Sequence, residues 1–235
     1  MKLKKINKYT YPEEATENFD GANFHIRYCL SFLKKYLKGD ILEVGAGRGS
    51  FTRNYYNDKI NFLILTERDK KNILDLNLKF KNNKRVKVKN IFIKNIKQKF
   101  DVILYFHVLE HIKNDLLEIK QATKKLKKNG ILIILSPAHQ KLYSNLDKIV
   151  GHFRRYQKDF FLQKFNELKL IRLRFLDTSG YFLYYLNKVF FKKDGYPSKF
   201  KIFIWDKIFT PISIIADFIL GYKVGKCILA IYRKY

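Results

Sequence analysis

The chain has 235 residues, of which 48 are Lys or Arg and 21 are Asp or Glu, giving a net charge of +27. This length suits one large domain, and an apolar content of 47% is enough to form a buried core. Two cysteines, Cys29 and Cys227, stand far apart, which argues against a disulfide framework and indicates a reduced, cytosolic setting. The basic N-terminus, residues 1–19, has no apolar stretch and is not expected to be a secretory signal.

The excess of lysine admits three interpretations. A basic face can bind nucleic acid or an anionic lipid surface. Alternatively, a joint excess of Lys, Asn, Ile, Phe and Tyr is typical of an AT-rich genome and needs no binding partner. Lysine is spread evenly along the chain, and Arg, the more specific phosphate-binding residue, is the minority cation. These features favour compositional drift, with an anionic membrane surface next and nucleic acid last.

The predicted elements alternate between helices and strands. Apolar residues at helical spacing over residues 24–38 predict a helix that ends at Gly39. Several of the predicted strands are apolar on both faces, which predicts an α/β fold with a mostly parallel sheet covered by helices on both sides. Further helices are expected at 109–130 and 158–170, and strands at 41–44, 60–67, 85–93, 100–106, 130–137, 170–176 and 226–235.

The segment 180–222 is aromatic and apolar with lysines at its edges, and it predicts a helical insertion before the last strand. Asp206, Lys207, Pro211 and Asp217 interrupt its longer apolar run, so we expect no transmembrane helix. Three roles remain open: an interfacial segment on an anionic membrane, a lid over an acyl or polyprenyl acceptor, and a cap or homodimer interface. The membrane interpretation depends on Phe190, Phe191, Lys192, Lys193, Lys199 and Lys201.

A glycine-rich turn follows the first predicted strand, in the stretch DILEVGAGRGSF at residues 40–51. Glycines there let the backbone approach a ligand, and a following helix offers free N–H groups. A dinucleotide site requires G-x-G-x-x-G, but the last position of that pattern is Ser50. The pattern is instead E-x-G-x-G-x-G, formed by Glu43, Gly45, Gly47 and Gly49, which argues against NAD. Alternatives are a tight turn for the glycines and a helix-capping role for Glu43.

These residues resemble the class I S-adenosylmethionine (SAM)-dependent methyltransferase family over roughly residues 20–176. LEVGAGRG is similar to its first motif, FDVILYFHVLEHIKND to its fourth-strand motif, and NGILIILSPAH to its fifth-strand motif. Glu67, 22 residues after Gly45, stands where the family binds the ribose diol, unless it is a surface acid. Asn90 replaces an acid that often binds the adenine amine, although an Asn carbonyl can still accept that hydrogen bond.

The resemblance implies one domain over residues 1–235, with a doubly wound, seven-stranded, mostly parallel sheet, an N-terminal helix and the insertion before the last strand. It implies SAM as the cofactor. The implied cofactor-binding residues are Glu43, Gly45, Ala46, Gly47, Gly49, Glu67, Arg68, Asn90, Ile91 and His107.

A second motif lies in NLDKIVGHFRRYQKDFF, residues 145–161. It resembles a methyltransferase subgroup with a Gly-His-x-Arg-Arg-Tyr signature, whose members are often linked to sugar-transfer and cell-envelope enzymes. We expect His152, Arg154, Arg155 and Tyr156 to bind a phosphate or carboxylate of the acceptor, after a chain turn at Gly151. Alternatively, the arginine pair bonds to acids of the same domain, Asp147 or Asp159.

Methyl transfer requires the methyl carbon and the nucleophile to be held in line, and an oxygen or nitrogen nucleophile can also need a base. The candidate bases are His107, His152, Asp147 and Tyr156, and the sequence does not choose among them. We expect no metal, because His107, Glu110 and His111 lie in one segment without further ligands.

The predicted activity is methylation of an O or N atom on a small or lipid-linked acceptor of envelope or glycoconjugate metabolism. We expect a cytoplasmic protein, with the inner face of the membrane as a site of attachment. Two alternatives are an RNA methyltransferase, favoured by the charge, and a non-catalytic scaffold, which would not need Glu43, Glu67 and the glycines.

Overall fold

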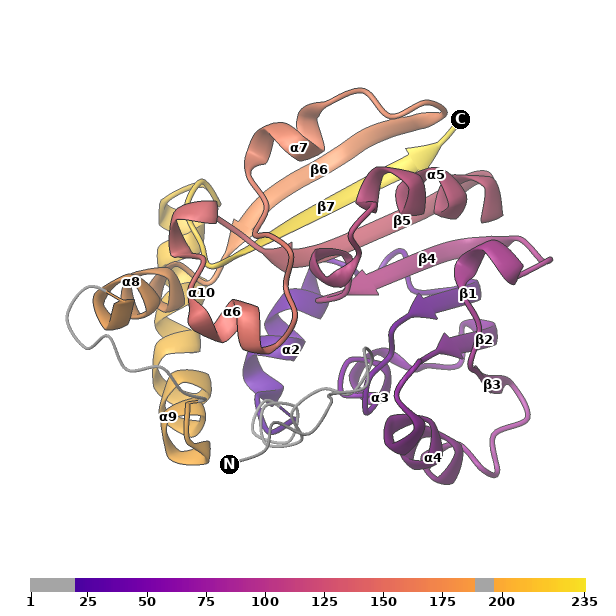
Figure 1. Ribbon diagram of the computed structural model, residues 1–235, viewed down its shortest axis with the longest axis horizontal. Helices are drawn as coiled ribbons and strands as arrows, with labels where there is room; N and C mark the ends of the chain where they lie inside the picture. Colours follow the sequence, from indigo (N-terminus) through magenta and orange to yellow (C-terminus); the bar gives the residue numbers. More distant parts are fainter. Residues whose placement is uncertain (1–19, 189–196) are drawn as a thin grey trace, which may run out of the picture.

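The computed structural model describes residues 20–188 and 197–235 (Figure 1). Its centre is a seven-stranded sheet with the order β3-β2-β1-β4-β5-β7-β6, in which β7 alone runs antiparallel to its neighbours. The strands are β1 (Gly39–Val44), β2 (Ile60–Thr66), β3 (Val86–Lys89), β4 (Phe100–Phe106), β5 (Leu126–Pro137), β6 (Leu168–Leu176) and β7 (Cys227–Lys234). The predicted mostly parallel, seven-stranded sheet is confirmed.

Helices cover both faces of the sheet, and each face has its own apolar core. On one face the sheet packs against α2 (Asn23–Ser31), α3 (Thr52–Tyr55) and α4 (Lys70–Lys79). The other face packs against η1 (Ile93–Asn95), η2 (Leu109–His111), α5 (Asp115–Lys125) and α7 (Lys158–Leu162). Two short elements, η3 (Gln140–Leu142) and α6 (Asn145–Ile149), follow β5. The central strands are therefore buried on both sides, as their continuous apolar runs predict.

Three predicted helices are shorter than their periodicity suggested. The first ends at Ser31 and continues as turns. Residues 126–129 join β5 instead of extending α5, because Leu126 pairs with Phe100 of β4 across a register shift. The helix predicted at 158–170 ends at Leu162, and Leu168 already pairs with β7. In each case the residues form a strand or a turn, although their apolar periodicity alone would allow a longer helix.

The insertion before β7 is helical in its described part. It contains α8 (Thr178–Leu186), α9 (Lys199–Ile204), a π-helical turn η5 (Trp205–Phe209) and α10 (Thr210–Ile219). Phe190, Phe191, Lys192 and Lys193, used in the membrane interpretation, lie outside the described residues. No helix in residues 20–188 and 197–235 is both long and apolar enough to span a bilayer.

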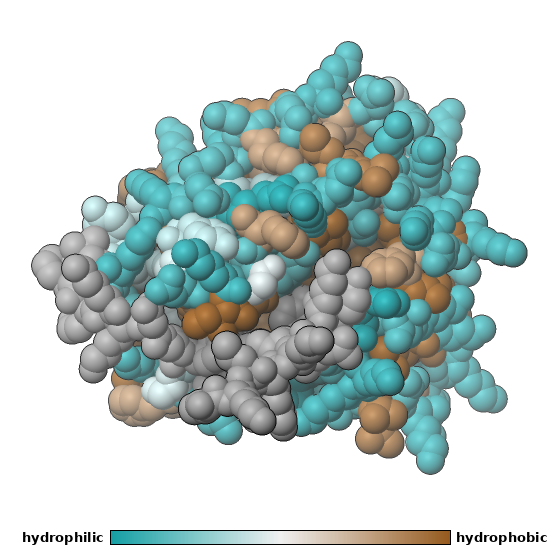
Figure 2. Space-filling model, in the orientation of Figure 1, coloured by the Kyte–Doolittle hydropathy of each residue, from teal (hydrophilic) through white to brown (hydrophobic). Residues whose placement is uncertain are grey.

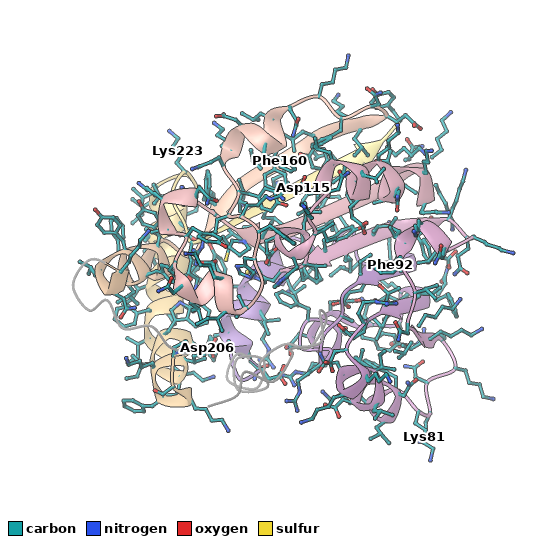
Figure 3. All side chains as sticks on the ribbon, viewed as in Figure 1. Lys81, Phe92, Asp115, Phe160, Asp206 and Lys223 are labelled. Carbon is teal, nitrogen blue, oxygen red and sulfur yellow. The ribbon has the colours of Figure 1, made fainter. Side chains whose placement is uncertain are left out.

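Three buried aspartates tie these helices to the rest of the fold. Asp177 accepts hydrogen bonds from the Gly180 N–H and the Trp205 indole. Asp206 accepts one from the His25 N–H at the start of α2, beside which it lies in Figure 3. Asp217 of α10 accepts one from the Tyr28 hydroxyl at 2.6 Å and another from the Asp177 N–H at 2.7 Å. The two aspartates that interrupt the apolar run, Asp206 and Asp217, are thus internal anchors.

Candidate active site

The glycine turn lies at the carboxyl end of β1. Gly45, Gly47 and Gly49 have φ angles of +67°, +55° and +78°, a region that favours glycine. A Cβ on Gly45 would lie 2.7 Å from a methyl carbon of Val108 in the segment after β4, whereas a Cβ on Gly47 would meet no atom of the described residues within 4 Å. Gly45 is therefore needed for packing, and Gly47 leaves open space that a ligand can approach.

Glu43 points into the protein below this turn and is almost fully buried. It accepts hydrogen bonds from the Thr52 hydroxyl at 2.6 Å and the Tyr55 hydroxyl at 2.7 Å, both on α3. Burial raises the pKa of Glu43 to about 7. In this geometry Glu43 holds α3 against β1, which supports the cofactor turn from behind.

Glu67 lies at the carboxyl end of β2 and faces the same turn. Its carboxylate accepts hydrogen bonds from the Gly47 N–H at 2.7 Å, the Arg68 N–H at 2.6 Å and the Asp69 N–H at 2.9 Å. The side chain is 4% exposed, so it is not a surface acid. A ribose diol at this position would donate to the same carboxylate that accepts from the Gly47 N–H. Glu67 can therefore bind the ligand and hold the glycine turn at the same time.

The remaining predicted cofactor residues gather beside Glu67. The Arg68 guanidinium donates to the Asn90 Oδ1 at 2.6 Å and stacks over the Phe92 ring at 4.3 Å. The Asn90 oxygen expected to accept from adenine is therefore bonded to Arg68 in this structure. Ile91 is half-buried next to it, and the Ala46 N–H donates to the Thr66 carbonyl at the end of β2.

The end of β4 carries a cluster of acid and imidazole groups. His107 has a φ of +55° and a partly exposed side chain. Its Nδ1 lies 3.7 Å from the carboxylate of Glu110, which is completely buried in η2. Burial lowers the pKa of His107 to about 3 and raises the pKa of Glu110. Near neutral pH His107 is thus an uncharged imidazole that can accept a proton only weakly.

The arginines of the second motif are bound to the protein's own acids. Arg155 donates to Asp147 at 2.9 Å, and Arg154 forms an ion pair with Asp115 at the start of α5. Asp147 was one of the two predicted intramolecular partners, and the other, Asp159, is replaced by Asp115. Both guanidinium groups thus pair with acids of the same domain, as the alternative interpretation predicted, while the Arg155 Nη1 has no hydrogen-bond partner among the described residues. Their contact with an acceptor stays a prediction.

Tyr156 is also internal. It is 2% exposed, and its hydroxyl lies within hydrogen-bonding distance of two acceptors, the Asp115 carboxylate at 2.9 Å and the Leu109 carbonyl at 3.1 Å. Burial raises its pKa, so the phenol stays protonated and is a poor candidate for the base. Sequence reasoning did not identify Asp115, which Figure 3 places at the start of α5. Its only sequence signal was an acid in the first turn of a helix.

His152 and Asp147 form the pair closest to a catalytic arrangement. His152 Nδ1 lies 2.7 Å from the Asp147 carboxylate, and His152 Nε2 lies 3.9 Å from Glu110. Gly151, with a φ of +82°, makes the turn that was predicted before His152. Hydrogen bonds from His152 and Arg155 lower the pKa of Asp147, which keeps this acid ionised and suits it to orient the imidazole.

The two motifs therefore form one unit at the carboxyl edge of the sheet, where open α/β sheets bind their ligands. A family model described as a methyltransferase domain matches residues 22–173, well over half of the chain. The chain belongs to this methyltransferase domain family. It is a SAM-dependent methyltransferase domain, and the open space at Gly47 beside Glu67 fits that cofactor.

Solved structures with this fold include coclaurine N-methyltransferase bound to N-methylheliamine and S-adenosylhomocysteine (SAH). Its TM-score is 0.64 at 14% identity, over 96% of this methyltransferase and 82% of that chain. NodS from Bradyrhizobium japonicum WM9, with SAH, has a TM-score of 0.56 at 15% identity, over 94% and 89%. A methyltransferase in complex with the Haloferax volcanii Trm112 activator has 0.62 at 9% identity, over 96% and 99%. At such low identities, the TM-scores show a shared fold and no more. A comparison with curated proteins finds no match.

Proposed function

We propose that this methyltransferase methylates an O or N atom of a lipid-linked acceptor of envelope or glycoconjugate metabolism, while it is attached to an anionic membrane. The observation that carries the proposal is the outward face of α10. Thr210, Ser213 and Asp217 of this helix are completely buried, whereas Ile212, Ile215 and Phe218 are 48%, 64% and 73% exposed. A helix of a soluble domain normally has the opposite pattern, with its apolar face inward.

The apolar face continues onto the neighbouring helices of the insertion. We call this set the membrane face: Phe182, Tyr185, Leu186, Phe200, Phe203, Ile208, Ile212, Ile215, Phe218 and Ile219, all exposed. Figure 2 shows brown apolar atoms among hydrophilic ones at the lower left, where α9 lies in Figure 1. Large exposed apolar surfaces mark partner or membrane contacts.

The charge around the membrane face has one sign. Lys199, Lys201 and Lys207 are exposed, whereas Asp206 and Asp217, the acids of the described residues 197–223, are buried. Apolar residues beside lysines favour an anionic bilayer over a neutral partner surface. A continuous set of exposed aliphatic groups favours a bilayer over nucleic acid, whose binding depends chiefly on contacts with phosphates.

The position of the insertion suits a lipid acceptor. The carboxyl ends of β4 and β5 point toward α8–α10 (Figure 1), so the catalytic edge and the membrane face lie at one end of the molecule. SAM supplies a methyl group on a positively charged sulfur. The chain's own residues hold the cofactor turn through Glu43 and Glu67 and bring the imidazoles of His107 and His152 to the same edge of the sheet. A lipid-linked head group could reach this edge while its chain stays in the bilayer.

Vesicle co-sedimentation tests the attachment. Binding should increase with the fraction of phosphatidylglycerol in phosphatidylcholine vesicles and decrease with salt, because surface charges are screened within about 8–10 Å. Ile215→Ser with Phe218→Ser should reduce partitioning at least tenfold, since burying each side chain contributes about 1.5 kcal/mol or more. Leu74→Ser with Leu78→Ser on α4 is the matched control, because both leucines are equally exposed but lie away from the insertion. Equal loss in both variants would contradict the proposal.

Methyl transfer from labelled SAM tests the acceptor class. The methyltransferase is incubated with lipid, aqueous small-molecule and RNA fractions of a cell extract, and label should enter the lipid fraction. Label in the RNA fraction would support an RNA methyltransferase instead. Label in the aqueous fraction would support methyltransferase activity but contradict the proposal of a lipid-linked acceptor.

A further inference from the structure

The carboxylate of Glu110 is an unusual feature of the carboxyl edge. It is completely buried, and neither oxygen has a hydrogen-bond partner among residues 20–188 and 197–235. The neighbouring Ser136 hydroxyl is buried and lowers the pKa of Glu110, but it forms no well-aligned hydrogen bond within the described residues. An isolated buried carboxylate is strongly unfavourable unless a cation or donor compensates it. Arg154 pairs with Asp115 and Arg155 with Asp147, so neither donates to Glu110, although the Arg155 charge lowers the pKa of Glu110.

The imidazoles of His107, His111 and His152 all approach this carboxylate, and those of His111 and His152 form a compact group with it. His111 follows Glu110 in η2, and His152 arrives from the loop before α7. Ligand atoms of Glu110, His111 and His152 all lie within 4.8 Å of one another. The His152 Nε2 lies 3.9 Å from Glu110 Oε1, and the two imidazole ring centroids are 4.6 Å apart.

Each imidazole is oriented by a partner on its other side. Asp147 holds His152 Nδ1 at 2.7 Å, and a backbone hydrogen bond links the His111 ring to Gly151. Metal-bound histidines typically have such a carboxylate or backbone partner, which fixes the tautomer and directs the second nitrogen. Asp147 is itself held by Arg155 at 2.9 Å and by the Ser144 N–H at 2.9 Å.

We propose that Glu110, His111 and His152 bind a divalent transition-metal ion. Two imidazoles and one carboxylate suit Zn²⁺, Co²⁺ or Mn²⁺, whereas Mg²⁺ and Ca²⁺ prefer oxygen ligands alone. Tetrahedral zinc, with bonds of about 2.0–2.2 Å, separates two ligand atoms by about 3.4 Å. The 3.9 Å separation of Glu110 and His152 therefore needs to shorten by only about 0.5 Å on metal binding.

Three protein ligands leave one coordination position of the metal ion open, and we assign that position to the methyl acceptor. This assignment rests on the proposed function. The cluster adjoins the cofactor turn, because Val108, two residues before Glu110, packs on Gly45. A metal ion there would lower the pKa of an acceptor hydroxyl. The hydroxyl proton passes to water, the oxygen–carbon bond forms, the carbon–sulfur bond breaks, and sulfur keeps the electron pair as SAH. The site thus favours an oxygen acceptor over an amine.

A second group, His25, His107 and Cys227, has similar spacing but is a weaker candidate. Burial raises the pKa of the Cys227 thiol to about 12, so its thiolate is disfavoured. Its side chains also have other packing roles, since His25 lies against the Trp205 ring at 4.7 Å. It does not contain a buried carboxylate without a hydrogen bond.

Metal binding can be measured without an acceptor or SAM. The chelator-treated protein is titrated with Co²⁺ and then Zn²⁺, using calorimetry and the visible ligand-field absorption of Co²⁺. We expect one ion per chain, with affinity lowered at least tenfold in Glu110→Gln and in His152→Gln. Asp147→Asn should lower it about 10–100-fold, since Asp147 orients a ligand. Glu118→Gln, which changes another acid of the same region, is the matched control and should bind as the wild type does.

Several results would overturn this proposal. One is the absence of stoichiometric binding by a folded wild-type protein. Another is unchanged affinity in Glu110→Gln with a normal melting temperature. Thiolate-to-cobalt charge-transfer absorption would instead place the ion at Cys227. If Glu110→Gln fails to fold, His152→Gln, which leaves Glu110 in place, decides the question. SAM affinity is measured on every variant, so a missing metal site is distinguished from a failure of methyltransferase function.

Discussion

Replacing Glu67 tests how the methyltransferase holds its cofactor. The carboxylate accepts hydrogen bonds at 2.7, 2.6 and 2.9 Å from backbone N–H groups, and the bond from Gly47 is the one that joins two separate loops. Hydrogen bonds to charged groups contribute about 1.5–3 kcal/mol each. Glu67→Ala removes both the diol acceptor and the support of the turn, so SAM and SAH should bind about 10–100-fold more weakly. The free energy of unfolding should fall by about 2–4 kcal/mol, because buried N–H groups lose their acceptor.

Calorimetry with SAM, SAH and NAD on the folded protein separates these effects, and NAD should give no heat with any variant. Asp69→Ala is the matched control. Asp69 is adjacent in sequence and caps α4 through Lys71 and Asn72 N–H groups, but it does not face the turn. It should cost about 1 kcal/mol of stability and leave SAM affinity unchanged. If Glu67→Ala binds SAM as tightly as the wild type while folded, the carboxylate is only a structural clamp and the reasoning is refuted.

Three further predictions concern the same edge of the sheet. Gly45→Ala should lower the free energy of unfolding by about 2–4 kcal/mol, because the new side chain combines a φ of +67° with a steric clash. Gly47→Ala should lower the free energy of unfolding by only about 1 kcal/mol and should mainly weaken SAM binding. Thermal melts measure the stability of both variants, and calorimetry measures their SAM affinity. Glu43 has a pKa of about 7 in the folded protein and 4.5 in the unfolded chain, so the stability it contributes is complete below about pH 4.5 and is lost as pH rises through 7. In denaturant titrations, the difference in unfolding free energy between wild type and Glu43→Gln should therefore shrink by up to about 3 kcal/mol over that pH range. A difference that does not change with pH would contradict the raised pKa. Asp115→Asn should destabilise the fold by about 2–4 kcal/mol, since it leaves a buried Tyr156 hydroxyl and an arginine without their anionic partner; an unchanged denaturation midpoint would show that this contact contributes little.

Much of the fold was predictable from local pattern. Alternating apolar runs located five of the seven strands within two residues at each end, whereas β5 begins four residues earlier than predicted and β3 ends at Lys89, four residues before the predicted end at 93. The glycines at 45, 47 and 49 predicted a turn whose backbone a ligand can approach. Their positive φ angles are a local backbone preference of glycine. These features were readable because each is specified by a short stretch of chain.

The ends of the helices and the ion-pair partners of charged side chains were less predictable. Residues 126–129 have helical spacing with the preceding segment, but pairing with β4 lowers their free energy further as strand. The arginines of the second motif were expected to bind an acceptor, and nothing in their sequence identifies Asp115, about 40 residues earlier, as the partner of Arg154. Ion pairs of this kind depend on which loops meet at the sheet edge.

The grouping of Glu110, His111 and His152 illustrates the limit most clearly. Sequence spacing placed Glu110 and His111 in one short segment and indicated no further ligand, whereas the fold brings His152 beside them through the turn at Gly151. The apolar outward face of α10 was likewise hidden, because helical periodicity specifies that Ile212, Ile215 and Phe218 share a side but not which side the sheet covers. Periodicity and backbone preferences are local and can be read from sequence, while the facing of a helix and the meeting of distant loops are decided by the packing of the whole chain.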